Sequence, residues 1–170
     1  MPVTPFHLGP GMLLKSLAHD RFSFLTFGIS QVIMDLQPLF AMLTGIGPIH
    51  GSTHTYAGAT LIAPIAAVIS KLLVGPMLVY WNRNFEGPDW LGQFYTQVSA
   101  PVLLGSAFIG TYSHIFLDSM MHADMQPFFP LDYANSLLSL TDAYSLHIYC
   151  LALGIVGIIV YGALRFVRGK

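Results

Sequence analysis

Histidines recur at a spacing of four residues, alone or with an aspartate, at two places in the chain. His50 and His54 form an i,i+4 pair, and His114, Asp118 and His122 form an i,i+4,i+8 series. Residues four apart lie on one face of a helix with Cβ atoms about 5–6 Å apart, so two such side chains can reach one cation. Neutral imidazole and carboxylate are ligands that zinc and similar divalent ions favour. Both segments therefore predict metal binding.

Two acids extend these segments, and each candidate residue also has a structural interpretation. Asp124 stands shortly after His122, and Asp35 lies within a long apolar stretch. Acids at membrane depth are costly and are treated as functional by default. The structural alternatives are a helix-packing hydrogen bond for Asp35, a hydrogen-bonded pair for His114 and Asp118, a solvated loop for His50 and His54, an interfacial position for His122 and Asp124, and a mobile N-terminus for His7.

The elements that must position these residues are long and apolar. Of the 170 residues, 54% are apolar and only 9% carry a charge, against about 25% charged in soluble domains. A bilayer core about 30 Å thick is spanned by roughly 20 apolar residues in a helix. Uncharged runs of at least this length cover residues 36–70, 90–117 and 143–164. The sequence therefore predicts an integral membrane protein.

We expect an all-α membrane protein with four transmembrane helices in a single membrane domain, residues 1–170. The formal net charge of −1 provides no basic surface for nucleic acid. The lone Cys150 excludes a disulfide framework and a Cys-based zinc site. The predicted spans cover about 22–43, 56–81, 100–121 and 143–164.

A shorter apolar piece, residues 10–18, precedes the first span. As a helix it is about 14 Å long, half the hydrocarbon thickness, so it cannot cross the membrane. The polar triplet 19–21 predicts a turn, and His7 and Asp35 each lie fourteen residues from Arg21. An antiparallel hairpin would bring them face to face about 20 Å above the turn. We therefore expect a short N-terminal re-entrant helix, with an interfacial helix as the alternative.

The distribution of Lys and Arg predicts the orientation, because cytoplasmic loops carry the excess of these residues. With both termini cytoplasmic, the outer loops contain Asp124, Asp132 and Asp142 but no Lys or Arg. In this topology all the candidate ligands converge on the outer half of the membrane. The inner ends then carry Lys15, Arg21, Arg83, Arg165, Arg168 and Lys170.

The order of these motifs matches a known pattern. Its parts are Thr-Pro-Phe-His at 4–7, Asp35 followed by Pro38, His-Gly-Ser-Thr-His at 50–54, and Ser-His-Ile-Phe-Leu-Asp at 113–118 followed by Pro127 and Pro130. Together they resemble the YdjM-like family, bacterial inner-membrane proteins described as metal-dependent hydrolases. The resemblance covers about residues 5–130 and leaves the last span outside it. It also suggests distant kinship with zinc-dependent phospholipase C and nuclease P1-like enzymes.

The resemblance implies a bacterial inner-membrane location and a centre of one to three divalent ions, most simply Zn²⁺. The chain departs from the family pattern at Gly51, where arginine is common, and at Leu36 and Gln37, where a second acid is common. These departures imply an altered phosphate contact and one fewer metal. The implied metal ligands are His7, Asp35, His50, His54, His114 and Asp118.

We therefore expect a hydrolase of a phosphoester in a membrane lipid or lipid-linked substrate, in which metal ions activate water and polarise the phosphoryl oxygen. Asp118 or Asp35 would bridge two ions, and Asp124 or His122 would serve as general base or further ligand. The alternative is a metal-ion or proton-coupled transporter or channel, which would use the same cluster and need homo-oligomerisation. A third possibility is a structural membrane subunit whose fold is stapled by metal.

Overall fold

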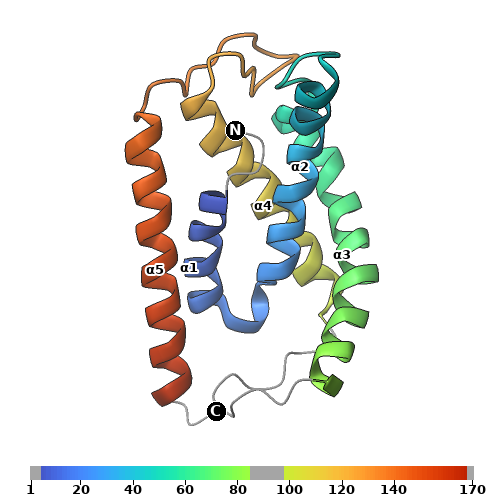
Figure 1. The fold of residues 1–170 in the computed structure, drawn as a ribbon, viewed down its shortest axis with the longest axis vertical. Coiled ribbons are helices and arrows are strands. Elements are labelled where there is room, and N and C mark those ends of the chain that lie inside the picture. Colours follow the sequence, from blue (N-terminus) through green and yellow to red (C-terminus); the bar gives the residue numbers. More distant parts are fainter. Residues whose placement is uncertain (1–4, 85–97, 168–170) are drawn as a thin grey trace.

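The computed structural model describes residues 5–84 and 98–167, and every regular element among them is helical (Figure 1). Three short 3₁₀ turns precede or connect the longer helices: η1 (Pro5–His7), η2 (His19–Arg21) and η3 (Ser52–His54). The α-helices are α1 (Leu8–Ala18), α2 (Phe24–Thr44), α3 (Tyr56–Asn84), α4 (Ala100–Met121) and α5 (Ala143–Val167).

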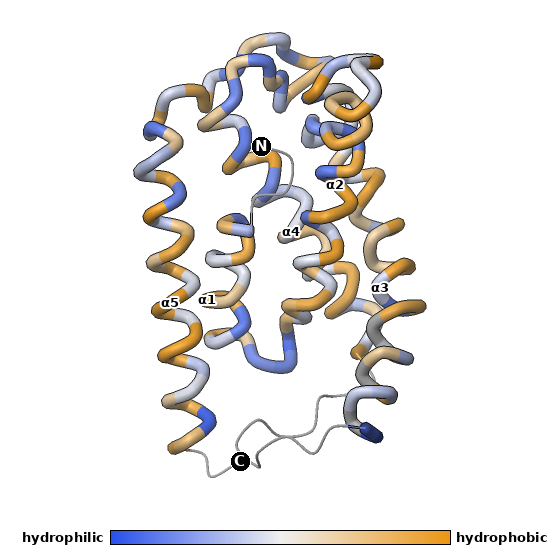
Figure 2. Tube along the Cα trace, viewed as in Figure 1, coloured by the Kyte–Doolittle hydropathy of each residue, from blue (hydrophilic) through white to orange (hydrophobic). Residues whose placement is uncertain are grey.

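Helices α2 to α5 are long and apolar enough to cross a membrane, with mean hydropathies between 1.3 and 2.2 in their most apolar stretches (Figure 2). The predicted all-α membrane fold with four spans is thereby confirmed. The first span begins at Phe24 because Ser23 caps the helix: its hydroxyl accepts a hydrogen bond of 3.3 Å from the Thr26 amide. The span ends at Gly45, whose positive φ of 68° suits a residue without a side chain.

Small residues let α2, α3 and α4 approach closely. Ala63 and Ala66 of α3 pack against Leu103 and Ala107 of α4 in one buried cluster. A side chain at Gly110 of α4 would collide with α2. Close backbone approach of this kind drives helix association where lipid removes the hydrophobic contrast. These three helices form the frame of the candidate site.

Helix α1 and α2 form the predicted hairpin, with the turn at η2. At 11 residues α1 is about 16 Å long, and it is not among the helices long enough to span. It packs lengthwise against α2 and α5, as expected for a re-entrant helix. Lys15 stabilises the turn by donating hydrogen bonds to the carbonyls of His19 (2.6 Å) and Phe22 (3.0 Å).

The close packing of α1 on α5 was not predicted from the sequence. A Cβ at Gly157 of α5 would lie 2.5 Å from the Leu13 nitrogen, and a Cβ at Gly9 of α1 would collide with the Cys150 carbonyl oxygen. The two backbones therefore touch at both glycines, and neither position has room for a side chain. This contact holds the N-terminal end of α1, where His7 lies, against the bundle.

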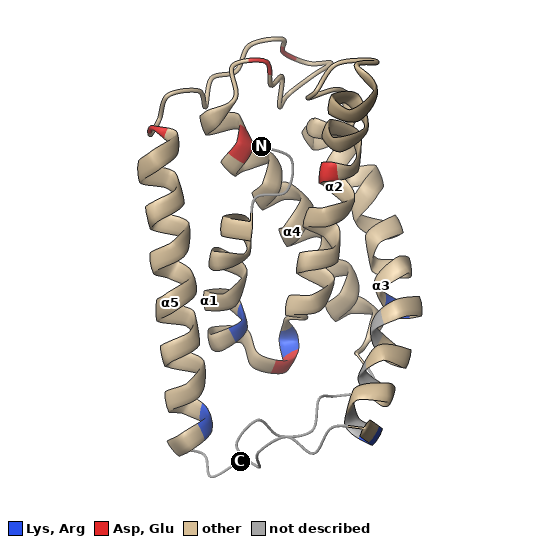
Figure 3. Cartoon of the chain, viewed as in Figure 1, with Lys and Arg blue, Asp and Glu red and all other residues tan. Residues whose placement is uncertain are grey.

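Charges separate along the long axis of the bundle (Figure 3). The end that holds η2 and the C-terminal ends of α3 and α5 carries Lys15, Arg21, Arg83 and Arg165 with one acid, Asp20, whereas the other acids of the described residues lie towards the opposite end. The separation matches the pattern on which the orientation was predicted. The identity of the membrane and the cytoplasmic placement of the termini stay predictions, and Arg168 and Lys170 lie outside the described residues.

The segment between α4 and α5 folds over the acidic end of the bundle. The Tyr56 amide donates a 2.8 Å hydrogen bond to the Pro127 carbonyl, which ties the segment to the start of α3. The Asn135 side chain donates to the carbonyls of Ser119 (2.9 Å) and His122 (3.1 Å). These bonds satisfy carbonyls at the C-terminal end of α4 and hold the segment beside the predicted ligands.

Candidate metal centre

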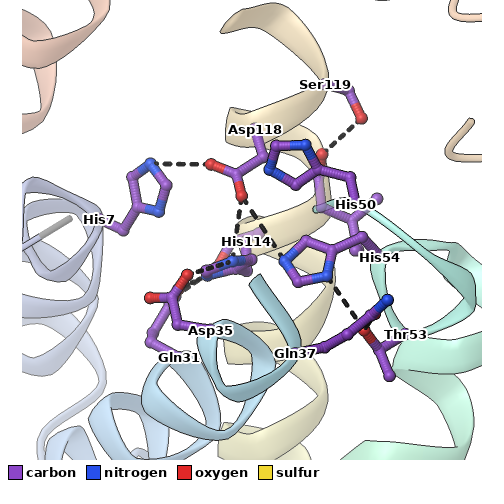
Figure 4. A network of polar contacts seen from close by, with 12 residues as sticks. His7, Gln31, Asp35, Gln37, His50, Thr53, His54, His114, Asp118 and Ser119 are labelled. Carbon is purple, nitrogen blue, oxygen red and sulfur yellow. Dashed lines mark hydrogen bonds and ion pairs between the residues drawn. The ribbon is translucent and has the colours of Figure 1, made fainter. Parts of the chain in front are cut away.

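Side chains from α2, η3 and α4 meet near the acidic end of the bundle (Figure 4). Asp35, His54, His114 and Asp118 each offer one ligand atom, and these atoms all lie within 4.8 Å of one another. All four residues are buried. We refer to these four residues as the deep group.

A second set of ligand atoms lies nearer the surface. His50, Asp118 and His122 also offer ligand atoms within 4.8 Å of one another, and the rings of His50 and His122 are 4.5 Å apart between centroids. Both histidines are partly exposed. We refer to these three residues as the outer group; Asp118 belongs to both groups.

The Asp118 carboxylate is the point on which the imidazoles converge. Its Oδ2 lies 3.1 Å from the Nε2 of His114 and 3.9 Å from the Nε2 of His54. Its Oδ1 lies 3.5 Å from the Nε2 of His7. The Nε2 of His114 lies a further 3.5 Å from the Asp35 carboxylate. The convergence predicted from spacing and depth is therefore present in the fold.

His7 lies beside the deep group, at the end of η1. Its ring meets the ring of His114 edge to face at a centroid distance of 5.2 Å, and it is almost completely buried. The hairpin thus raises His7 to the level of Asp35, as predicted, although its closest charged partner is Asp118 on α4 rather than Asp35.

The donor atoms fit a divalent cation. Both ring nitrogens of His7 and the Nε2 atoms of His54 and His114 are buried and have no hydrogen-bond partner among the residues that the structure describes. An unsatisfied buried polar atom costs about 1–3 kcal/mol, and here several point at the same two carboxylates. A shared cation would satisfy the Nε2 atoms of His54 and His114 together, and imidazole with carboxylate is a ligand set of zinc.

Burial also keeps the imidazole of His54 in the form that binds metal. Removal from water lowers the pKa of His54 to about 3, because a charged ring is poorly solvated there. A metal ligand must be a neutral imidazole. His54 therefore needs no deprotonation to bind an ion at neutral pH.

Asp124 hydrogen-bonds to His50 and not to His122, the histidine that is close to it in the sequence. Its Oδ2 accepts a 2.8 Å hydrogen bond from the Nδ1 of His50, and its side chain is 56% exposed. Burial alone would raise the pKa of Asp124, but the hydrogen bond from His50 holds it below its usual value. Asp124 thus stays an anion that orients His50, an arrangement common behind metal-binding histidines.

Three residues that support the candidate ligands, two of them by direct contact, were not predicted from the sequence. Gln31 accepts a 2.6 Å hydrogen bond from the Nδ1 of His114, and Thr53 lies 3.1 Å from the Nδ1 of His54. Gln37 accepts a short hydrogen bond from Thr53. The available signal was that Gln31 stands one helical turn before Asp35, on the same face of α2.

The two departures from the resembled family lie next to one another. A Cβ at Gly51 would collide with the side-chain amide of Gln37. A residue larger than glycine at position 51 is therefore incompatible with the observed placement of Gln37.

The chain matches no family model, no curated protein and no solved structure. The resemblance to the YdjM-like family therefore stays a prediction from the motifs.

Proposed function

We propose that this protein is a membrane-embedded, metal-dependent hydrolase that cleaves a phosphoester in a lipid or lipid-linked substrate. The observation that carries the proposal is the sharing of Asp118 between the deep group and the outer group. A carboxylate shared in this way can bridge two ions, and paired ions are a recurrent arrangement in phosphoester hydrolysis.

The two groups differ in the way that separates structural from catalytic sites. The deep group offers four protein ligands and is closed from solvent, whereas the outer group offers three and is partly exposed. A site with three protein ligands leaves a position for water or substrate. When bound, zinc would activate water as a nucleophile near neutral pH and withdraw charge from a phosphoryl oxygen. The chain contributes placement: Asp118 joins the groups, and Asp124 orients His50 towards the open one.

The depth of the centre supports a lipid headgroup as the substrate. Asp118 lies three residues before the end of α4 at Met121, about 5 Å below that end. Asp35 lies nine residues before the end of α2 at Thr44, about 14 Å below it. If the helix ends mark the membrane surface, the outer group stands close to the level of lipid phosphates.

The packing of the bundle favours hydrolysis over transport. Among the described residues, every buried His, Asp, Glu, Lys or Arg side chain belongs to the cluster around Asp118. The half of the bundle nearer η2 combines apolar side chains such as Phe27 with small hydroxyl side chains such as Ser30 and Ser106, none of which is ionisable. A path for ions or protons needs ionisable groups along its length, and the buried ionisable groups of the described residues lie at one end.

Metal analysis and an activity screen test the proposal together. Protein purified in detergent should contain zinc, and it should release phosphate or a headgroup from phospholipid vesicles or a phosphodiester in a chelator-sensitive way. Metal retained without any hydrolysis would favour the structural subunit, and metal flux in proteoliposomes would favour the transporter. Protein that binds no divalent ion would refute the proposed function.

A further inference from the structure

We propose that Gln31 and Gln37 of α2 are positioning residues that determine which ring nitrogen carries the proton in His114 and in His54. In both rings Nδ1 carries a proton, which leaves Nε2, the nitrogen that faces Asp118, to bind an ion. The inference about metal binding rests on the proposed metal centre, whereas the position of the protons is a property of the chain itself.

For His114, the assignment follows from the bonds of the Gln31 amide. Its nitrogen donates to the Gly110 carbonyl (3.2 Å) and to the Ser113 hydroxyl (3.3 Å), which leaves its oxygen to face His114. An amide oxygen only accepts hydrogen bonds, so the Nδ1 of His114, at 2.6 Å, must be the donor. The reversed amide would direct its oxygen at the Gly110 carbonyl. Two groups of α4, the Gly110 carbonyl and the Ser113 hydroxyl, thus fix the orientation of the Gln31 amide. The amide in turn determines that Nδ1 of His114 carries a proton.

For His54, the assignment runs through a hydroxyl. The Gln37 nitrogen donates to the Pro48 carbonyl at 3.4 Å, so its oxygen accepts the Thr53 hydroxyl proton. A hydroxyl has one proton, and once that proton is used the Thr53 oxygen can only accept at its other contacts. The Nδ1 of His54, 3.1 Å away, is therefore the donor.

The position of these protons matters because the opposite arrangement would block metal binding. A proton on Nε2 would occupy the lone pair that points at Asp118, and the ring would have to rearrange before binding an ion. Gln31 and His54 are both buried, so bulk water offers no easy substitute for the lost partner. Partners of this kind change metal affinity by about 10–100-fold when removed.

Gly51 provides an independent way to disturb the same chain of bonds. Its backbone φ is −97°, which an alanine also adopts, and the nearest described atoms that an added Cβ would meet belong to the side-chain amide of Gln37. Gly51→Ala would therefore push the amide away from Thr53 without altering any ligand.

The decisive measurement is the NMR spectrum of histidine-labelled protein, in which ring ¹⁵N and ¹³C shifts report the protonated nitrogen. In the metal-free protein we expect the His54 ring to carry its proton on Nδ1, with the signal assigned by its loss in His54→Gln. Thr53→Ser keeps the hydroxyl and should preserve this state, whereas Thr53→Val removes it and should give a mixture. A wild-type His54 protonated on Nε2, or a Thr53→Val spectrum identical to wild type, would overturn the proposal.

Zinc titration of the same variants separates this proposal from the proposed function. Wild-type protein and Thr53→Ser should bind zinc alike, and Thr53→Val and Gly51→Ala should bind about 10–100-fold more weakly. Thr60→Val is the matched control, because the Thr60 hydroxyl bonds Tyr56 and Tyr112 outside the centre. No zinc binding by wild type would refute the proposed function and leave the proton assignment to the NMR. Equal binding by Thr53→Val and Thr53→Ser would refute the positioning role.

Variants of Gln31 test the assignment of the His114 proton in the same way. Gln31→Glu keeps an oxygen acceptor for Nδ1, whereas Gln31→Met fills a similar volume without one. Zinc-bound Gln31→Glu should retain a proton on the Nδ1 of His114, and Gln31→Met should bind zinc more weakly than Gln31→Glu. The reverse order of affinity would contradict the assignment, and the Thr53 pair provides the test if a Gln31 variant does not fold.

Discussion

The deep group and the outer group use the same ligand types and share Asp118, yet they are supported in different ways. In the deep group, His114 hydrogen-bonds to the amide of Gln31 and His54 to the hydroxyl of Thr53, and both partners are neutral. In the outer group, His50 donates a hydrogen bond to the carboxylate of Asp124, whose side chain is largely exposed.

The difference indicates how burial and exposure favour different partners for the candidate metal-binding histidines. An extra buried charge is costly unless it is paired, and the deep group already contains Asp35 and Asp118. Neutral partners orient the rings there without adding a third charge. Near water a carboxylate carries little desolvation cost, so Asp124 can orient His50 as an anion.

The largest effect should come from the residue common to both groups. Asp118→Asn keeps the shape of the side chain but removes the charge that would hold two ions, so bound zinc should fall to near background by elemental analysis. Hydrolysis should be lost with it. Retention of the full wild-type zinc content would show that Asp118 is not shared and would remove the basis of the comparison.

Substitution of a residue that belongs only to the deep group should remove less zinc than Asp118→Asn. His114→Ala removes the imidazole that contacts both carboxylates, and we expect it to abolish the tighter class of zinc sites in a chelator competition. The outer group keeps its three ligands, so a weaker class should survive. Loss of all zinc would indicate that the two groups cannot be filled separately.

A ligand of the outer group should separate binding from activity. His122→Ala should leave the tight class of zinc sites intact, because no deep ligand changes, while phosphoester hydrolysis falls by at least about 100-fold. Elemental analysis and kinetics on the same preparation provide the measurement. Normal activity in this variant would place the open position in the deep group instead.

The smallest effect should come from the partner of His50. Asp124→Asn keeps an oxygen that can accept the Nδ1 proton but removes the charge, so zinc affinity of the weak class should fall by about 10-fold. Isothermal titration would measure this change. Asp132→Asn, an exposed acid on the same loop, is the control and should bind zinc like wild type.

The framework of the molecule was predictable because lipid leaves a strong mark on composition. The four predicted spans agree with the helices to within three residues at each end, and the polar triplet at 19–21 located the turn of the hairpin. The candidate ligands His114 and Asp118 were predictable because they stand one turn apart on α4. The i,i+4 spacing of His50 and His54 also predicted a site, although His50 lies in a bend and His54 in η3, and the two belong to different groups.

The supporting contacts were not predictable because they depend on how helices cross. Gln31 and Gln37 have no distinctive spacing to His114 or His54, which lie on other elements. Asp124 shows the same limit, since its closeness to His122 in sequence concealed its bond to His50. The glycines of α1 and α5 acquire their meaning only once the two backbones are known to touch.

That glycine contact gives α5 an importance that its side chains do not reveal. No residue of α5 belongs to either ligand group, and a shortened chain ending before Ala143 would still contain every imidazole and carboxylate of the centre. Such a fragment would nevertheless lack the helix against which α1 packs. We expect His7, at the N-terminal end of α1, to lose its position beside Asp118 as a result. A functional fragment should therefore have to include α5, which contributes its backbone contact with α1 and no candidate ligand.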